Sequence, residues 1–180
     1  FGQLPERSGL GYKGGPQLAT WRSGMLNYHP VPGFVAGLYA PIWAGSHFEI
    51  QPELLVSLEG AALATPEGGN SVTRTVQTIV PVSLKVYLNR TFNLQAGVQG
   101  GYSVYATVDG KDARDKLRPV EMGFNGGIGL DMESGFDLTL RYHGGMSDLL
   151  VEDKSVYPTD RTLQLTAGFR FLQFNRQRTR

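Results

Sequence analysis

The sequence contains no cysteine, and this absence excludes disulfide frameworks, thiolate metal sites and thiol nucleophiles. It also has no run of the roughly 18 apolar residues that a membrane-spanning helix needs. Neither sign of charge dominates, because 17 basic residues are balanced by 16 acidic ones and the formal net charge is +1. No overall field therefore attracts a polyanion, and we expect no nucleic acid partner. The length of 180 residues predicts a single domain.

What the chain does have is an alternation of apolar and polar side chains, which is clearest in residues 48–59. A period of two is typical of a β-strand with two chemically different faces, and a helix would scramble it. Leu55 is the exception to the pattern. The apolar face consists of Phe48, Ile50, Pro52, Leu54, Val56 and Leu58, and the polar face of Glu49, Gln51, Glu53, Ser57 and Glu59.

The same alternation predicts eight strands along the chain. Their approximate ranges are 9–21, 34–43, 48–59, 76–87, 92–104, 120–132, 136–143 and 163–171. The connections alternate in length: those at 44–46, 88–91 and 133–135 are tight, and those at 23–32, 60–71, 107–118 and 144–160 are long. This order is typical of an up-and-down barrel in an outer membrane, with short periplasmic turns and longer outer loops.

The predicted fold is therefore all-β, an eight-stranded antiparallel up-and-down transmembrane β-barrel. Residues 9–172 are expected to form the barrel, residues 1–8 a periplasmic lead, and residues 173–180 a basic periplasmic tail. The expected location is a bacterial outer membrane. Both termini would lie in the periplasm, on the side of the tight turns.

Alternation alone does not say which face is inside, so a soluble lipocalin-like barrel or a β-sandwich is the alternative. The apolar face carries no Asp, Glu, Lys, Arg, Asn or Gln in any strand, a purity that lipid enforces because a charge at its midplane costs about 2–4 kcal/mol. The polar face is rich in glycine, which makes room in a narrow lumen. These glycines are Gly97, Gly101, Gly123, Gly127, Gly129 and Gly168. Both observations favour lipid on the outside.

Four phenylalanines favour the same orientation. Phe48, Phe92, Phe136 and Phe171 all lie at the turn-proximal ends of their strands. In a barrel this puts them at one height, and aromatic side chains at one height are typical of the interface between lipid and water. We therefore predict that they form half of an aromatic girdle.

Charged side chains of both signs fall on the predicted inner face. A lone buried charge is costly, so we expect these side chains to pair in a network that fills the lumen. Lys85 with Glu49 or Glu53 is a candidate pair, but the long loop before residue 76 leaves the register open. The full set is Lys13, Glu49, Glu53, Lys85, Asp137, Arg141 and Arg170.

No catalytic, cofactor or metal site is predicted. His143 and Ser147 lie four residues apart and would share a face of the seventh strand, but residues 144–146 indicate that the strand is ending there. No third group is identifiable that would orient the imidazole. His29 and His47 are not at metal-ligand spacing. We therefore expect neither an enzyme nor a cofactor.

Seven segments carry a family resemblance through their order and spacing. They are residues 11–15, 33–38, 50–55, 79–82 with Lys85, 97–102, 123–129 and 141–145. Together they resemble the PorT-type outer-membrane β-barrel domain family of Bacteroidetes. The resemblance implies an outer-membrane barrel of about this length, usually without enzymatic activity. One member takes part in the secretion machinery linked to gliding, a role that fold likeness does not transfer.

The expected function is that of a non-enzymatic outer-membrane barrel that serves as a structural or accessory subunit of a larger secretion, transport or assembly complex. Its partners would be outer-membrane lipid and other outer-membrane proteins, met through lipid-facing Gly100 and Gly126 or through loop 144–160. That loop contains the apolar residues Leu149, Leu150, Val151 and Tyr157. The alternatives are a small pore or transporter, a lipid-modifying outer-membrane enzyme, and a soluble lipocalin-like binding barrel.

Overall fold

The chain folds into β-strands that follow the alternation. The computed structural model describes residues 8–22, 28–44, 47–64, 70–112, 120–146 and 159–174. No helix in these residues is long and apolar enough to cross a membrane. The strands are β1 (Gly9–Arg22), β2 (Tyr28–Tyr39), β3 (Ile42–Trp43), β4 (Phe48–Ala64), β5 (Asn70–Tyr87), β6 (Phe92–Val108), β7 (Lys111–Asp112), β8 (Val120–Asp131), β9 (Phe136–Gly145) and β10 (Thr159–Gln173).

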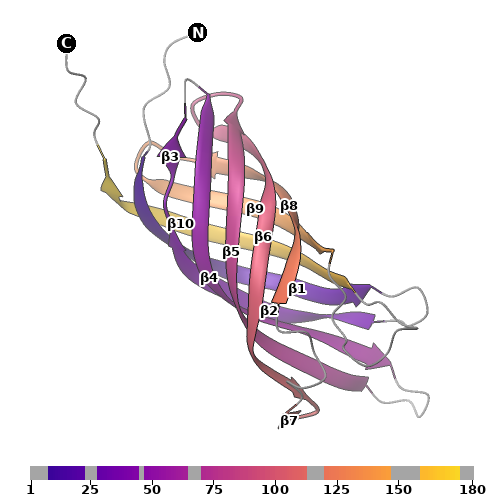
Figure 1. Ribbon diagram of the computed structural model, residues 1–180. Coiled ribbons are helices and arrows are strands. Elements are labelled where there is room, and N and C mark those ends of the chain that lie inside the picture. The colour runs from indigo at the N-terminus through magenta and orange to yellow at the C-terminus, as the bar shows by residue number, and fades with distance from the viewer. Residues whose placement is uncertain are drawn as a thin grey trace, which may run out of the picture.

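The eight long strands close into a barrel (Figure 1). Each pairs antiparallel with the next long strand along the chain, and β1 pairs with β10 to close the ring. The two short strands lie outside this ring order, β3 beside β4 and β7 beside β6. The predicted eight-stranded antiparallel barrel is therefore confirmed.

The tight connections lie together at one end of the barrel, which we call the turn end. The turn between β5 and β6 is held by Asn89, whose Oδ1 accepts hydrogen bonds from the backbone N–H groups of Thr91 and Phe92, each at 2.8 Å. The turn between β8 and β9 uses Gly135, whose φ of +95° favours glycine. The start of β1 and the end of β10, which pair with each other, lie at this end too (Figure 1). We call the opposite end the loop end.

Several strands run further towards the loop end than predicted, among them β4, β5 and β6. β4 continues to Ala64, β5 begins at Asn70, and β6 continues to Val108, so parts of the predicted loops 60–71 and 107–118 are strand. The alternation stops near Gly60 because small and apolar residues follow one another there. Backbone pairing does not depend on alternation, and it extends to the Ala64–Asn70 pair.

The second strand is also shifted from its predicted range. β2 begins at Tyr28 and ends at Tyr39, and only Ile42 and Trp43 pair beyond it, as β3. Pro41 has no N–H to donate, so the ladder breaks there. The apolar and polar pattern of residues 28–33 is too weak to show the early start.

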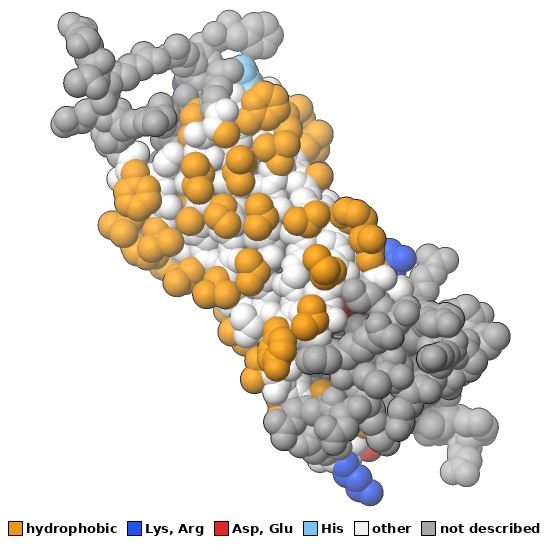
Figure 2. All heavy atoms as spheres, in the orientation of Figure 1, with side chains coloured by type: hydrophobic (Ala, Val, Ile, Leu, Met, Phe, Trp, Pro, Cys, Tyr) orange, Lys and Arg blue, Asp and Glu red, His pale blue; other side chains and the backbone are white. Residues whose placement is uncertain are grey.

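The apolar face points outward. Leu54 is 56% exposed, while the neighbouring Glu53 is only 3% exposed, and this contrast repeats from strand to strand. Figure 2 shows apolar side chains over the wall of the barrel, while the basic side chains that stand out in this view lie towards the loop end. A soluble protein would not expose such a surface to water. The orientation with lipid outside therefore holds, and the soluble alternative does not.

The lumen is mostly polar but contains a small apolar cluster of Val35, Leu55 and Ile79, all nearly fully buried. Leu55, the exception in the alternation of β4, thus faces inward against its ladder partner Ile79. Space is short elsewhere: a Cβ on Gly168 would overlap the carboxylate of Asp137. At this position glycine makes room for a lumen charge.

Candidate functional site: the charged lumen

The centre of the lumen is crossed by a three-residue ion network. Arg141 on β9 donates two hydrogen bonds to Glu53 on β4, from Nη1 to Oε2 at 2.8 Å and from Nη2 to Oε1 at 2.6 Å. Lys13 on β1 reaches the same carboxylate at 3.1 Å from Oε1, and Gln51 donates to that oxygen at 2.6 Å. The fork geometry of Arg141 is the strongest form of such a pair. Strands far apart in the ring are thereby joined through its middle.

A second ion network lies nearer the turn end. Lys85 on β5 has its Nζ 3.0 Å from Oδ2 of Asp131 on β8 and 3.6 Å from Oε1 of Glu49 on β4. The hydroxyl of Tyr87 donates to Oε2 of Glu49 at 3.0 Å and also to Asp131. Glu49 lies directly opposite Lys85 in the β4–β5 ladder, so this pair follows from the register.

The remaining predicted lumen residues lie at the same level. Asp137 accepts a hydrogen bond from the hydroxyl of Tyr39. Arg170 is buried and lines a small cavity of about 10 Å³ together with Asp137, Glu49 and Asp131. All seven charged residues predicted for the inner face are thus buried inside the barrel. The structure brings Lys13, Glu53 and Arg141 into one group and Glu49 and Lys85 into another.

An uncharged hydrogen-bond chain separates the central network from the loop end. Gln164 on β10 donates to Oε1 of Gln17 at 3.0 Å, and Gln17 donates to Oγ of Ser57 at 2.6 Å. Ser57 in turn donates to Oε1 of Glu59. This series of hydrogen bonds therefore orients the carboxylate of Glu59, which has no basic partner in the described part of the molecule.

The predicted set of lumen charges left out five further buried acidic and histidine side chains. The period of two places four of them, Glu59, Glu121, Asp131 and His143, on the polar faces of their strands. Asp160 was placed in the predicted loop 144–160, whereas β10 begins at Thr159. The five are Glu59, Glu121, Asp131, His143 and Asp160.

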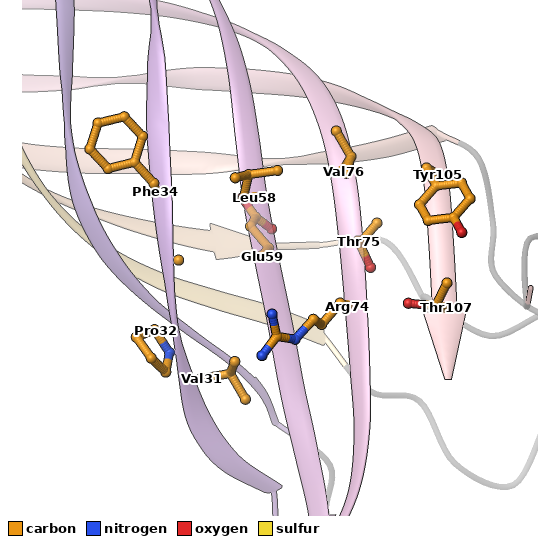
Figure 3. Close-up of a pocket in the computed structure, with 11 residues that line it drawn as sticks. Val31, Pro32, Phe34, Leu58, Glu59, Arg74, Thr75, Val76, Tyr105 and Thr107 are labelled. Carbon is orange, nitrogen blue, oxygen red and sulfur yellow. The ribbon is translucent and has the colours of Figure 1, made fainter. Parts of the chain in front are cut away.

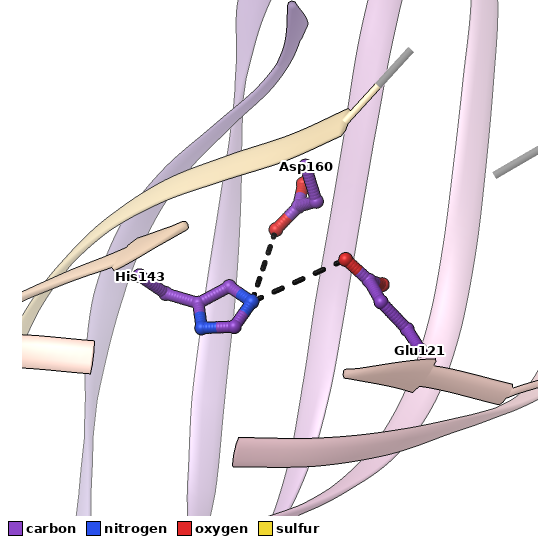
Figure 4. Close-up of side chains that lie close together, drawn as sticks. All are labelled: Glu121, His143 and Asp160. Atoms are coloured by element: carbon purple, nitrogen blue, oxygen red, sulfur yellow. Dashed lines mark ion pairs between the residues drawn. The ribbon is translucent and has the colours of Figure 1, made fainter. Parts of the chain in front are cut away.

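His143 and Ser147, which the sequence analysis weighed and rejected as a catalytic pair, cannot be placed relative to each other, because Ser147 lies outside the described residues. His143 is buried in the lumen, with its Nε2 4.0 Å from Oε1 of Glu121 and 3.9 Å from Oδ2 of Asp160 (Figure 4). The carboxylates of Glu121 and Asp160 thus lie beside the His143 imidazole, for which the sequence alone identified no orienting group. His29 is exposed and His47 is half-buried, and neither belongs to this cluster.

The four phenylalanines of the predicted girdle lie on the outer wall towards the turn end. Each begins its strand or, for Phe171, lies near the end of β10, and all are about half exposed. Phe136 packs against Phe169 with 4.7 Å between ring centroids, and Tyr12 stacks on Phe171 at 6.1 Å. Aromatic side chains therefore gather at this height of the wall.

The outer wall is hollowed near the loop end, where β2, β4, β5 and β6 pass. The hollow has a volume of about 440 Å³, and apolar side chains including Phe34, Leu58 and Val76 line it. Beside the hollow, β2 has one more residue than its partner β4 between Pro30 and Phe34, and this extra residue forms a β-bulge in β2. Figure 3 shows the guanidinium of Arg74 pointing into the same space.

In chemical terms the central and turn-end networks of the lumen pair buried charges of opposite sign. Removing one partner from a buried pair costs about 3–5 kcal/mol, whereas the pair as a whole adds little stability. The central network therefore holds strands in place and fills the lumen. It resembles no arrangement of nucleophile and base that would carry out a reaction.

Comparisons with known proteins agree with this architecture. Residues 1–151 match the family model described as outer membrane protein beta-barrel domain. No curated protein sequence matches the chain.

Among solved structures, the barrel is similar to Neisserial surface protein A, with a TM-score of 0.59 and 12% identity, over 93% of this chain and 100% of that chain. It is similar to Ail, the attachment invasion locus protein of Yersinia pestis, with a TM-score of 0.53 and 13% identity, over 92% and 99%. OprG from Pseudomonas aeruginosa has a TM-score of 0.52 and 11% identity, over 94% and 98%. At such identities the likeness shows a shared fold.

The family model covers most of the chain, and the closed barrel with an apolar outer wall is the fold that such a family requires. The chain belongs to the outer membrane protein beta-barrel domain family.

Proposed function

We propose that this outer-membrane barrel is a non-enzymatic structural or accessory subunit of a larger membrane complex, and that it is not a pore. One observation carries the proposal: the Arg141–Glu53–Lys13 network crosses the lumen at its centre. The interior of an eight-stranded barrel is only wide enough for side chains to fill it. A barrel filled in this way offers its outer wall and its loops for function.

The resemblance to PorT-type barrels of Bacteroidetes supports the same proposal, because these barrels usually have no enzymatic activity. In this assignment the turn end faces the periplasm, together with both termini and the basic tail 173–180. The loop end then faces the outside of the cell. Most of loop 144–160, with its apolar residues, lies outside the described residues.

The outer wall provides a surface on which another membrane protein could pack. Gly126 on β8 lies opposite Ala96 on β6, and Gly100 follows on the same face of β6. A Cβ added at Gly100 would meet nothing within 4 Å, so this part of the wall is flat and faces away from the barrel. Small residues allow close approach between backbones in a membrane.

Planar-bilayer recording distinguishes this proposal from a pore. We expect purified, folded protein to produce no stable conductance above that of protein-free bilayers. Isolation of the native complex from membranes, with identification of its components, should then recover defined partners. A reproducible ohmic conductance in bilayers, or a barrel that is always recovered alone, would contradict the assignment.

The hollow in the outer wall supports a second candidate function, binding of an amphipathic molecule with an anionic group. Phe34, Leu58 and Val76 would contact its apolar part, and Arg74 its anionic group. We expect the change Arg74→Gln to weaken binding of a fluorescent fatty acid by about tenfold. Lys111→Gln, at another exposed cation of the loop end, should leave the affinity unchanged. Equal affinity of both variants would remove this candidate.

A further inference from the structure

We propose that Glu121, His143 and Asp160 form a binding site for a divalent first-row transition metal ion, with Zn²⁺ as the best match. The three side chains come from the adjacent strands β8, β9 and β10 and meet in the lumen near the loop end (Figure 4). The site is separate from the central network that carries the proposed function. It also departs from the expectation, drawn from the sequence, that the chain holds no metal.

The donor atoms already surround a common point. One donor atom of each residue lies within 4.8 Å of the other two. Nε2 of His143 is 4.0 Å from Oε1 of Glu121 and 3.9 Å from Oδ2 of Asp160. Tetrahedral Zn²⁺ with bonds of about 2.0–2.2 Å separates its ligands by about 3.4 Å. The two gaps to His143 would therefore have to close by roughly half an ångström, and the two carboxylate oxygens, which lie within 4.8 Å of each other, would have to approach as well, to bring three ligands to this spacing.

One buried oxygen of the cluster has no hydrogen-bond partner. Glu121 is only 5% exposed, and its Oε1, the oxygen that faces His143, accepts no hydrogen bond. Unsatisfied buried polar atoms are rare, and a bound ion is one of their ordinary explanations.

Neighbouring groups hold the carboxylates in place, as outer-shell partners do at metal sites. Gln77 donates to Oε2 of Glu121 at 3.4 Å, which leaves Oε1 turned to the imidazole. Thr162 donates to Oδ2 of Asp160 at 2.8 Å. Such hydrogen bonds orient ligands and raise metal affinity.

The charge of the lumen points the same way. Seven buried acids face four buried Lys and Arg residues, a formal excess of three negative charges among the described residues. The four buried bases lie in the central and turn-end layers, so the excess falls on Glu59, Glu121 and Asp160. None of these three forms an ion pair with a Lys or Arg among the described residues. A bound divalent cation would compensate most of this charge.

Two glycines leave the room that the cluster occupies. A Cβ at Gly145 would lie 2.6 Å from Oε1 of Glu121, and one at Gly123 would lie 2.6 Å from Cε1 of His143. Any larger residue at either position would push a ligand side chain out of the cluster.

The mixed donor set selects the class of metal. Imidazole favours Zn²⁺ and its transition-metal neighbours, and carboxylate oxygens are accepted by all of them. Mg²⁺ and Ca²⁺ prefer ligand sets made only of oxygen. With three protein ligands, the site would keep a fourth position for water.

Calorimetric titration of ZnCl₂ into the folded full chain, prepared without a histidine tag, tests the proposal. We expect one Zn²⁺ per chain. His143→Gln, Glu121→Gln and Asp160→Asn should each weaken binding by at least about tenfold. His29→Gln, which removes an exposed histidine, is the matched control and should bind like the unchanged protein. Heat-modifiable migration on gels verifies that each variant is folded.

Co²⁺ gives a readout that does not depend on the variants. Bound in place of Zn²⁺, it should give the visible absorption bands of a four-coordinate nitrogen and oxygen site, and Zn²⁺ should abolish them. The proposal is overturned if the folded protein binds no Zn²⁺ while infrared spectra show protonated carboxyl groups that Glu121→Gln removes. Binding that His143→Gln leaves intact and His29→Gln eliminates would overturn it as well.

Discussion

Glu53 shows at the scale of single residues how one buried carboxylate can organise a lumen. It is surrounded by the guanidinium of Arg141, the ammonium of Lys13 and the amide of Gln51. Lys13 additionally lies 4.8 Å from the centroid of the Tyr39 ring. Each of these groups satisfies part of a charge that would otherwise be expensive to bury.

Removing Arg141 should therefore destabilise the barrel. We expect Arg141→Met to lower the free energy of unfolding by about 3 kcal/mol, at the lower end for a broken buried pair because Lys13 stays beside Glu53. Urea unfolding of the barrel in lipid vesicles, followed by tryptophan fluorescence, measures the loss. Lys111→Met, at an exposed position, is the control. A loss below about 1 kcal/mol, as for a surface pair, would show that Arg141 adds no more than its packing.

A second residue-scale prediction concerns pH and Asp109, in the turn after β6. Hydrogen bonds from the Ser71 hydroxyl and from the N–H of Val72 lower the pKa of Asp109 below its ordinary value of 3.8. Because the pKa of Asp109 is lower in the folded state than in the unfolded state, its hydrogen bonds stabilise the folded protein above pH 3.8. This stabilisation is lost as the pH falls through the lowered pKa of the folded state.

Hydrogen exchange of the Val72 amide tests this contact. Below pH 4 its protection should fall as Asp109 takes up a proton, after correction for the intrinsic pH dependence of exchange. Asp109→Asn should show low protection at every pH. Protection that is identical in the two proteins would mean that the carboxylate does not hold this turn.

At the scale of elements, a strand of this barrel is defined by two faces and by its ladder. Alternation located β4 through Glu59, and pairing alone carries it on to Ala64. Leu55 breaks the pattern locally, yet it has a place among the inward apolar side chains. The middle of each strand could thus be predicted from the sequence. The strand ends at which apolar and polar residues stop alternating could not.

The outward position of Leu54 provides an element-scale test. Leu54 lies six positions after Phe48 at the start of β4, which places it near the middle of a strand segment that spans lipid in about 9–11 residues. We expect Leu54→Arg to cost about 2–4 kcal/mol in lipid vesicles, and Leu88→Arg in the turn after β5 to cost about 0–1 kcal/mol. Equal costs for the two changes would contradict the assigned depth.

At the scale of the whole molecule, the orientation of the barrel in a membrane depends on ring closure and on the difference between the turn end and the loop end. The turn end gathers the tight connections and the paired ends of β1 and β10. Eight strands return the chain to the end where it began. The assignment of the turn end to the periplasm follows the general habit of such barrels.

Labelling of introduced cysteines tests the orientation cleanly, because the chain has no native cysteine. On intact cells, a membrane-impermeant maleimide should label Lys111→Cys at the loop end. It should label Asn89→Cys at the turn end only after the outer membrane is permeabilised. The reverse pattern would place the turn end outside the cell.

The sequence by itself determined the number of long strands, their antiparallel succession and the face that meets lipid, because alternation is a local property that each strand carries along its own length. Only the tertiary structure decided which charges meet. Glu53 and Arg141 lie 88 positions apart, and Glu121, His143 and Asp160 come from three strands. Such meetings depend on the register between strands and on ring closure, and long loops leave both undetermined in the sequence.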